Sequence, residues 1–182
     1  DMLTGSDGDF KKLYLDGGDF NKFFSNGLNG FGGDAKIGRD SDDTTVLRLG
    51  DMDGDGDLDL LAGNYAQTNK LYFNDGSGDF TGSSGLNPGS DIDDDADFTL
   101  AMLIGDVDND GDLDVLMGNE GQTNKLYLND GNGEFSTWED IGIDTDSTTS
   151  LALGDIDNDG DLDLLAGNKG QTNKLYLNDG SG

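Results

Sequence analysis

Residues 50–64 read GDMDGDGDLDLLAGN, residues 105–119 read GDVDNDGDLDVLMGN, and residues 154–168 read GDIDNDGDLDLLAGN. A second block follows each of them after a short gap: QTNKLYFNDGSGDF from 67, QTNKLYLNDGNGEF from 122 and QTNKLYLNDGSG from 171. Equivalent positions are 55 residues apart from Asp51 to Asp106 and 49 apart from Asp106 to Asp155. Periods of this size are typical of propeller blades or solenoid units, and not of independent domains.

Short strand signals fill each repeat. Runs of Thr, Val, Leu and aromatic residues at 44–49, 58–62 and 69–74 are bounded by Gly, Asn and Asp, and Phe80-Thr81 begins a fourth, weaker run. Asn-Asp-Gly at 74, 129 and 178 is a strong hairpin signal. No stretch combines helical periodicity with helix caps. We therefore predict an all-β fold of propeller-type blades with four antiparallel strands each, and about fourteen strands in groups of three, four, four and three.

The repeats predict how the chain is divided. Asp1-Met2-Leu3-Thr4-Gly5-Ser6 aligns with 59–64, so Asp1 corresponds to the last residue of a loop. At the other end, Gly182 stops where the first complete repeat continues to Phe80. We expect one array of about 3.5 repeats, part of something longer, in which a closed ring is incomplete and a signal peptide is not visible. The expected units are a partial repeat 1–43, repeats 44–97 and 98–147, and a partial repeat 148–182.

The chemistry lies in three nine-residue segments, 51–59, 106–114 and 155–163, which we call the first, second and third acidic loops. Each carries Asp at positions 1, 3, 5, 7 and 9 and Gly at position 6. Five carboxylates in nine residues repel one another unless a cation balances them, and Gly permits the sharp turn that wrapping around an ion requires. Oxygen-only ligands favour calcium, while magnesium retains its waters and is the weaker candidate. We expect side-chain ligands at positions 1, 3, 5 and 9 and a backbone carbonyl at position 7.

Two related calcium motifs do not fit. A helical calcium hand needs Glu at position 12, where this chain has Ala62, Met117 and Ala166. The calcium-binding β-helix repeats every nine residues, and this chain does not. Solvated Asp-Gly turns remain an alternative for one loop and become a poor one for three loops with the same pattern. We expect the acidic runs at 40–43, 91–97 and 144–146 to be solvated, with an accessory ion or ligand site as the alternative. We expect Tyr72, Tyr127 and Tyr176 to be blade-packing residues, with ligand platforms as the alternative.

Composition excludes several functions. The 182 residues contain 39 acidic and 10 basic residues, for a formal charge of -29, and 36 of the acids are Asp. Phosphate binding needs Lys and Arg, so nucleic acid is an improbable partner, and an anionic membrane surface is equally unsuitable. The chain has neither Cys nor His, which rules out disulfides, thiolate metal sites and His-dependent nucleophilic catalysis. No apolar run approaches the roughly 18 residues of a membrane span.

The motifs G-D-x-D-x-D-G-D-L-D-L-L and N-K-L-Y-x-N-D-G-x-G-x-F resemble the FG-GAP and VCBS-type calcium repeats. These repeats occur in integrin α-subunit propellers and in many secreted bacterial proteins. The resemblance implies propeller blades with calcium in the hairpin between the first two strands, and at least three calcium ions. The Phe-Gly and Gly-Ala-Pro signatures are largely missing; Phe31-Gly32-Gly33 is a fragment of them. The implied ligands are Asp51, Asp53, Asp55, Asp57, Asp59, Asp106, Asp108, Asp110, Asp112, Asp114, Asp155, Asp157, Asp159, Asp161 and Asp163, with Asp1 as the remnant of a fourth site.

Two functions follow as expectations. The first is a non-enzymatic, calcium-stabilised module for adhesion or for surface or fibre structure, extracellular or at the cell surface of a bacterium. Its partners would be protein or glycan ligands and neighbouring repeats or identical subunits. The second is an accessory or catalytic segment of a secreted enzyme acting on polysaccharide or lipid. A carboxylate pair outside the acidic loops that faces a pocket would favour the enzyme. We expect no active site, because calcium accounts for almost every clustered Asp.

Overall fold

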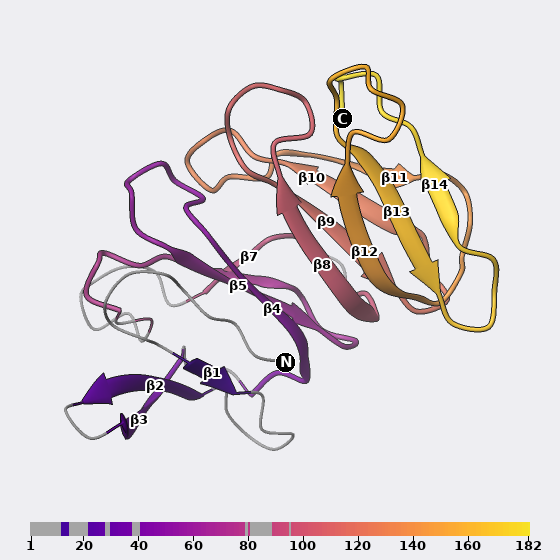
Figure 1. The fold of residues 1–182 in the computed structure, drawn as a ribbon. Helices are drawn as coiled ribbons and strands as arrows, with labels where there is room; N and C mark the ends of the chain where they lie inside the picture. Colours follow the sequence, from indigo (N-terminus) through magenta and orange to yellow (C-terminus); the bar gives the residue numbers. More distant parts are fainter. Residues whose placement is uncertain are drawn as a thin grey trace.

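The computed structural model describes residues 12–14, 22–27, 30–37, 41–78, 80, 89–94 and 96–182. These residues contain fourteen strands and no helix, in four antiparallel sheets that follow one another along the chain (Figure 1). The all-β prediction and the grouping of strands into three, four, four and three are confirmed. The strands are β1 (Lys12–Tyr14), β2 (Lys22–Gly27), β3 (Gly30–Lys36); β4 (Thr44–Gly50), β5 (Asp59–Asn64), β6 (Lys70–Tyr72), β7 (Ser90–Asp91); β8 (Thr99–Gly105), β9 (Asp114–Asn119), β10 (Asn124–Leu128), β11 (Thr137–Ile141); and β12 (Thr148–Gly154), β13 (Asp163–Asn168), β14 (Lys174–Tyr176).

The acidic loops occupy the same place in three sheets. Each loop joins the two strands of the hairpin β4–β5, β8–β9 or β12–β13. All three loops lie along one edge of the array, which runs from the upper left to the top of Figure 1. The strand register is identical, because Gly50 pairs with Asp59, Gly105 with Asp114, and the corresponding Gly with the corresponding Asp in the third hairpin. Position 9 of each loop is therefore the first residue of the second strand. The repeats in the sequence correspond to repeats of backbone structure.

The fourth strand of the second sheet differs from the prediction. Phe80 does not start a strand: it lies in a turn, with its side chain buried among residues such as Tyr72. The strand that pairs with β6 is β7, in which Asp91 lies opposite Lys70. The same order holds in the next sheet, where β11 begins after Phe135. The aligned Phe packs against the hydrophobic core and the fourth strand follows it; Thr81 lies outside the described residues.

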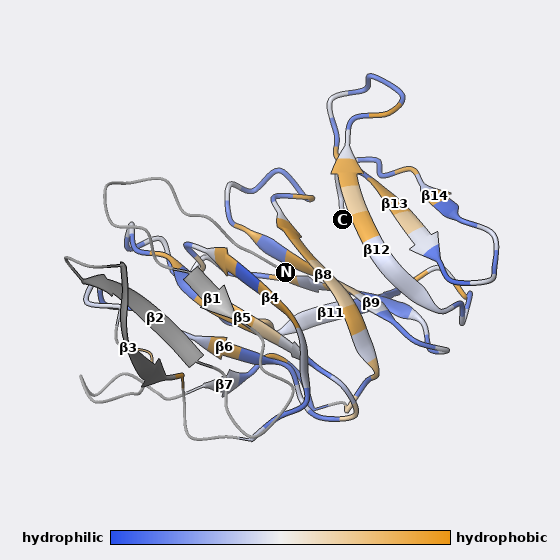
Figure 2. Cartoon of the chain, turned by 60° about the horizontal axis from the view of Figure 1, so that its bottom comes forward, coloured by the Kyte–Doolittle hydropathy of each residue, from blue (hydrophilic) through white to orange (hydrophobic). Residues whose placement is uncertain are grey.

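Apolar clusters fill the spaces between successive sheets. Between the second and third sheets, Met52, Leu61 and Leu71 meet Met102 and Val115. Between the third and fourth sheets, Val107, Leu116 and Leu126 meet Leu151 and Leu164. The third sheet thus uses one face toward the second sheet and the opposite face toward the fourth, as the two-residue periodicity of strands allows. Figure 2 shows apolar residues along these strands and hydrophilic loops at their ends. Tyr72 and Tyr127 are buried and Tyr176 packs against the second cluster, which confirms the packing role predicted for them.

At the edge opposite the acidic loops, backbone hydrogen bonds join one sheet to the next. Ala66 N–H, after β5, donates to the carbonyl oxygen of Asp97, which precedes β8, at 2.9 Å. Gly121 N–H, after β9, donates to that of Asp146, which precedes β12, at 3.1 Å. The rings of Tyr65 and Phe98 stack beside these bonds with centroids 4.8 Å apart. We call this edge the backbone seam.

Candidate metal centre

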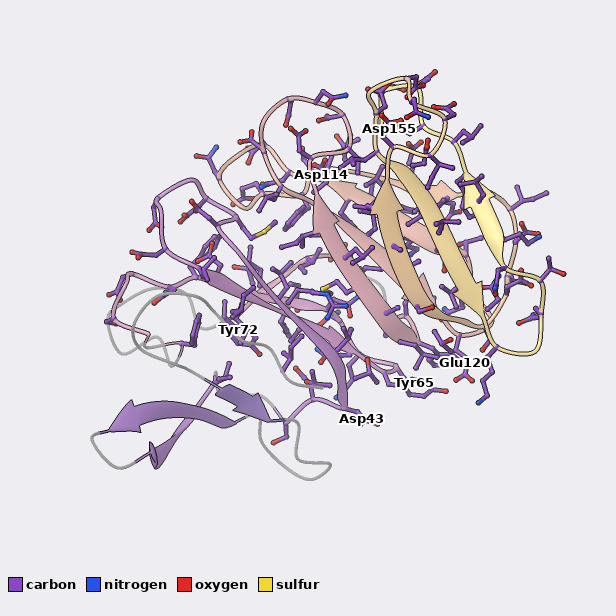
Figure 3. The ribbon with its side chains drawn as sticks, in the orientation of Figure 1. Asp43, Tyr65, Tyr72, Asp114, Glu120 and Asp155 are labelled. Atoms are coloured by element: carbon purple, nitrogen blue, oxygen red, sulfur yellow. The ribbon has the colours of Figure 1, made fainter. Side chains whose placement is uncertain are left out.

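Each acidic loop gathers three carboxylates. One oxygen from each of positions 1, 3 and 9 lies within 4.8 Å of the others in all three loops. Asp114 and Asp155 mark two of these groups in Figure 3. A donor set made only of carboxylate oxygens suits a hard divalent cation. The three groups, which we call the triads, are Asp51, Asp53 and Asp59; Asp106, Asp108 and Asp114; and Asp155, Asp157 and Asp163.

Two triads contain a buried oxygen without a hydrogen-bond partner. The Oδ1 atoms of Asp51 and Asp106 are both buried and both lack a donor. The other oxygen of each accepts a backbone N–H, from Gly56 at 3.0 Å and from Gly111 at 3.1 Å respectively. A buried carboxylate oxygen without a partner is costly, and a bound cation would satisfy it. The residues of the triads therefore fit a divalent metal.

Position 9 holds the loop to the hairpin that follows it. Both oxygens of Asp59 accept backbone N–H groups, from Met52 at 2.9 Å and from Asn74 at 2.9 Å. Asp114 accepts in the same way from Val107 at 2.9 Å and from Asn129 at 3.0 Å. Asp163 repeats the arrangement with Ile156 and Asn178. Each position-9 carboxylate is thus fixed in direction before any ion binds.

Positions 5 and 6 shape the turn. The Gly residues at position 6 have φ angles of 94°, 100° and 105°, as the sharp turn predicted for this position requires. At position 5, one oxygen of the Asp side chain accepts the backbone N–H of position 7, at 2.8 Å in the first loop and 2.9 Å in the second. The structure does not bring Asp55, Asp110 or Asp159 into the triads. Their role as ligands stays a prediction.

Position 7 faces the next hairpin. A Cβ atom added at Gly76, in the first Asn-Asp-Gly turn, would lie 2.6 Å from Asp57 Oδ2, and one at Gly131 would lie 2.5 Å from Asp112 Oδ2. These side chains lie against the turn glycines and outside the triads, as does Asp161 beside Gly180. The arrangement leaves the backbone carbonyl as the predicted ligand at this position. Asp1, the predicted remnant of a fourth site, lies outside the described residues.

The electrostatic environment differs among the loops. Burial raises the pKa of Asp59 to about 6, against the opposing effect of the N–H groups of Asn74 and Met52. Burial also raises the pKa of Asp114. The N–H groups of Asn178 and Ile156 instead lower the pKa of Asp163. Asp163 is covered by its own loop and hairpin, but no sheet of the described chain packs beyond them, so the donors outweigh burial.

The acidic runs are solvated only in part: Asp43, Asp91 and Asp94 are exposed, as predicted, and Asp97 is not. Asp97 is buried, and its Oδ2 atom lies 2.9 Å from Lys125 Nζ, which in turn lies 4.8 Å from the centre of the Trp138 ring. Lys174, at the equivalent place, lies 3.0 Å from Asp144 and is more exposed. Lys125 and Lys174, which belong to the repeated Asn-Lys-Leu-Tyr motif, thus pair with acids that we predicted to be solvated. A Lys residue at the same place in each repeat of a strongly acidic chain was the sequence feature that could have predicted these ion pairs.

Antiparallel sheets that follow one another, three of them with an acidic loop in the first hairpin, define a repeat protein with β-propeller-type blades. The family model for the FG-GAP-like repeat matches residues 51–117 and 106–166, which together make up more than half of the chain. The chain therefore belongs to the FG-GAP-like repeat family, and the resemblance in the motifs is confirmed.

Comparison with solved structures supports the fold. The chain is similar to one in the crystal structure of BBS1N in complex with ARL6DN, soaked with lead, with a TM-score of 0.54 and 12% sequence identity. The match covers 92% of this chain and 50% of that one, so this chain spans half the length of its structural relative. A search of curated proteins gave no match. Within the described residues, no helix has the length and apolar character needed to cross a membrane.

Proposed function

We propose that this chain is a calcium-stabilised, non-enzymatic repeat module that presents a binding surface outside the cell. The observation that carries the proposal is the triad, repeated three times, with buried and unpartnered oxygens in Asp51 and Asp106. Calcium takes six to eight oxygen ligands in flexible geometry, and the loops offer carboxylates and carbonyls in excess. Bound calcium would neutralise the mutual repulsion of the acids and fix each loop to its hairpin.

The proposed location and partners rest on the family and on the exposed surfaces. FG-GAP repeats are typical of extracellular proteins, where millimolar calcium suits sites of modest affinity. Leu165 and Leu175 are 40% and 47% exposed on the last sheet, while their counterparts Leu61 and Leu71 are 0% and 1% exposed between sheets. We propose a further repeat of the same kind, in a longer chain or in a second copy, as the partner for that face. Adhesion to a protein or glycan is the function proposed for the assembled module.

An enzyme is the second candidate, because one cavity carries acids outside the acidic loops. A cavity of about 640 Å³ between the last two sheets is lined in part by Glu139 and Asp140 of β11. Neighbouring residues of a strand point to opposite faces, so these two acids do not form a converging pair. Asp140 also accepts a hydrogen bond from Thr123 at 2.7 Å. Leu116, Leu126 and Leu164, which also line the cavity, belong to the apolar cluster that packs these two sheets together.

Thermal unfolding with and without calcium tests the proposal. A hundredfold excess of calcium over its Kd contributes about 2.7 kcal/mol at each site. A chain of this size shifts its Tm by about 2–4 °C per kcal/mol. Three sites therefore predict a fall of about 15 °C or more on adding chelator. The control combines Asp51→Asn, Asp106→Asn and Asp155→Asn, and its Tm should be insensitive to calcium. A fall of only a few degrees in the unaltered chain would contradict the proposal.

A further inference from the structure

A continuous series of hydrogen bonds connects the three triads. The backbone N–H of Met52, at position 2 of the first loop, donates to Asp59, and its carbonyl oxygen accepts the Asn129 side-chain amide at 2.9 Å. The backbone N–H of Asn129 donates to Asp114 of the second triad. One Asn residue of the third sheet therefore contacts the loop of its own sheet through its backbone and the loop of the preceding sheet through its side chain.

The same connection is repeated one sheet further on. Val107, at position 2 of the second loop, donates its N–H to Asp114 and accepts the Asn178 side-chain amide at 2.6 Å. The backbone N–H of Asn178 donates to Asp163 of the third triad at 3.0 Å. Met52 and Val107 are 1% and 3% exposed, so these bonds lie in the space between the sheets. Buried hydrogen bonds of this kind are strong and are costly to leave unmade.

The two Asn side chains are held rigidly. The Oδ1 atom of Asn129 accepts the N–H groups of Gly131 at 3.3 Å and Gly133 at 3.0 Å, while its amide group also donates to Leu113 at 3.2 Å. Asn178 has matching bonds to Gly180 and Leu162. A side chain fixed at both ends transmits a displacement of its backbone to the group that it contacts. Movement of Asp114 is therefore passed to Met52, and movement of Asp163 is passed to Val107.

We infer that Asn129 and Asn178 couple the acidic loops, so that a cation bound in one loop raises the affinity of the neighbouring loop. The inference rests on the proposed binding of divalent cations. A cation in the second triad would fix Asp114, hence Asn129, hence the carbonyl of Met52 and the geometry of the first triad. Because coupling between binding sites is reciprocal, a cation in the first triad favours the second by the same factor. Asn129 and Asn178 are positioning residues in this scheme, not ligands.

The sign of the cooperativity separates this coupling from simple electrostatics. Each bound cation adds positive charge to the array, so electrostatic repulsion alone would weaken binding of the next cation. The bonds through Asn129 and Asn178 predict the opposite. In 150 mM salt, where interactions between exposed charges beyond about 8 Å are largely screened, we expect positive cooperativity.

The experiment is calorimetric titration of the full chain with calcium in 150 mM NaCl. The unaltered chain should bind with positive cooperativity. The variant with Asn129→Asp and Asn178→Asp removes both donors to the preceding loops, keeps the oxygen acceptors and should bind with no positive cooperativity. Asn74→Asp is the control for each of the two substitutions: it adds one negative charge beside an acidic loop, as each of them does, and the amide of Asn74 donates to Leu58 of its own sheet at 3.1 Å. The inference would be overturned if the unaltered chain bound calcium independently at its sites or with negative cooperativity. Positive cooperativity that persisted in the double variant would also overturn it.

A second variant guards against misfolding of the first. Asp155→Asn with Asp157→Asn disables the third triad and removes two negative charges, the same number that a bound divalent cation offsets. The second triad of this variant therefore experiences nearly the same net charge in the third loop as it does in the unaltered chain with a cation bound there. We expect calcium affinity at the second triad to fall about fivefold or more, the lower limit of typical coupling. An unchanged or higher affinity would overturn the inference while leaving calcium binding intact, whereas no calcium binding by any form would overturn the proposed function and the inference together.

Discussion

The first two acidic loops and the third have almost the same sequence and different surroundings. Position 2 is Met52 or Val107 in the first two, at 1% and 3% exposed, and Ile156 in the third, at 47% exposed. The carboxylates at positions 1 and 3 are half-buried in the first two triads and exposed in the third. The difference arises because a following sheet packs against the first two loops. The properties of an acidic loop therefore depend on its neighbour as well as on its own nine residues.

The largest expected contrast lies in the lysines of the third and fourth sheets. Lys125 and Asp97 have side chains 8% exposed, so Lys125→Met leaves a buried carboxylate without its partner and should cost about 3 kcal/mol of unfolding free energy. Lys174→Met breaks a more exposed ion pair and should barely change the urea concentration at which half of the protein is unfolded. Urea denaturation in excess calcium measures both. Equal losses would contradict the difference in burial.

The next largest contrast is expected at position 9, where the same substitution should destabilise the second loop more than the third. Asp114→Asn removes a charged ligand and one of two acceptors for buried N–H groups, so we expect a loss of about 2 kcal/mol and a clear fall in calcium affinity. Asp163→Asn should also weaken its site, with a smaller loss of stability because solvent reaches the third loop. Calorimetric titration and urea denaturation of the two variants provide the test. If Asp163→Asn proved the more destabilising of the two, the comparison would be reversed.

The stability of the calcium-free protein should depend on pH through the raised pKa of Asp59. Its pKa of about 6 exceeds the unfolded value of 3.8, so the folded state binds more protons between these values and stability falls as the pH rises from about 4 to 6. After discounting for solvent near the loop, the change is about 1 kcal/mol. Asp59→Asn should lose that part of the pH dependence. Asp163→Asn should not, because the lowered pKa of Asp163 acts in the opposite direction. Melting curves at pH 4.5 and 7.5 in chelator compare the variants.

The smallest effects are expected at position 7. Asp112→Ala should change stability by less than about 0.5 kcal/mol and leave calcium affinity nearly unchanged, because the side chain lies outside the triad. Asp161→Ala removes an acceptor that receives the Asn109 side-chain amide from the second loop at 2.7 Å. It should therefore affect binding slightly more than Asp112→Ala. Titrations of both variants check this order, and a large loss for Asp112→Ala would mean that position 7 binds the ion through its side chain.

Repetition made much of the structure predictable. Three copies of the acidic loop fixed the hairpins and their order, and the turn of Gly56 and its counterparts follows from backbone sterics. The pairing of Asp97 with Lys125 was missed because a run of acids indicates solvent unless its partners are known. The contact between Asn129 and Met52 spans 77 residues and joins two sheets, so no local pattern could predict it. The third Asn-Asp-Gly turn has the same letters as the first two, and the exposure of its neighbours depends on what packs beside them.

The backbone seam described above gives the molecule two unlike edges. At the seam, bonds such as those from Ala66 to Asp97 and from Gly121 to Asp146 join successive sheets without any acidic side chain. The rings of Tyr65 and Phe98 reinforce them, and the Tyr65 hydroxyl donates to Glu120 at 2.9 Å (Figure 3). At the other edge, the sheets meet where fifteen acidic residues would repel one another in the absence of cations. Along the backbone seam, the sheets are joined by bonds that need no calcium. At the acidic edge, the bonds from Asn129 to Met52 and from Asn178 to Val107 also join the sheets, but they lie beside the acidic loops. Removal of calcium should therefore separate the sheets at the acidic edge first and at the seam last.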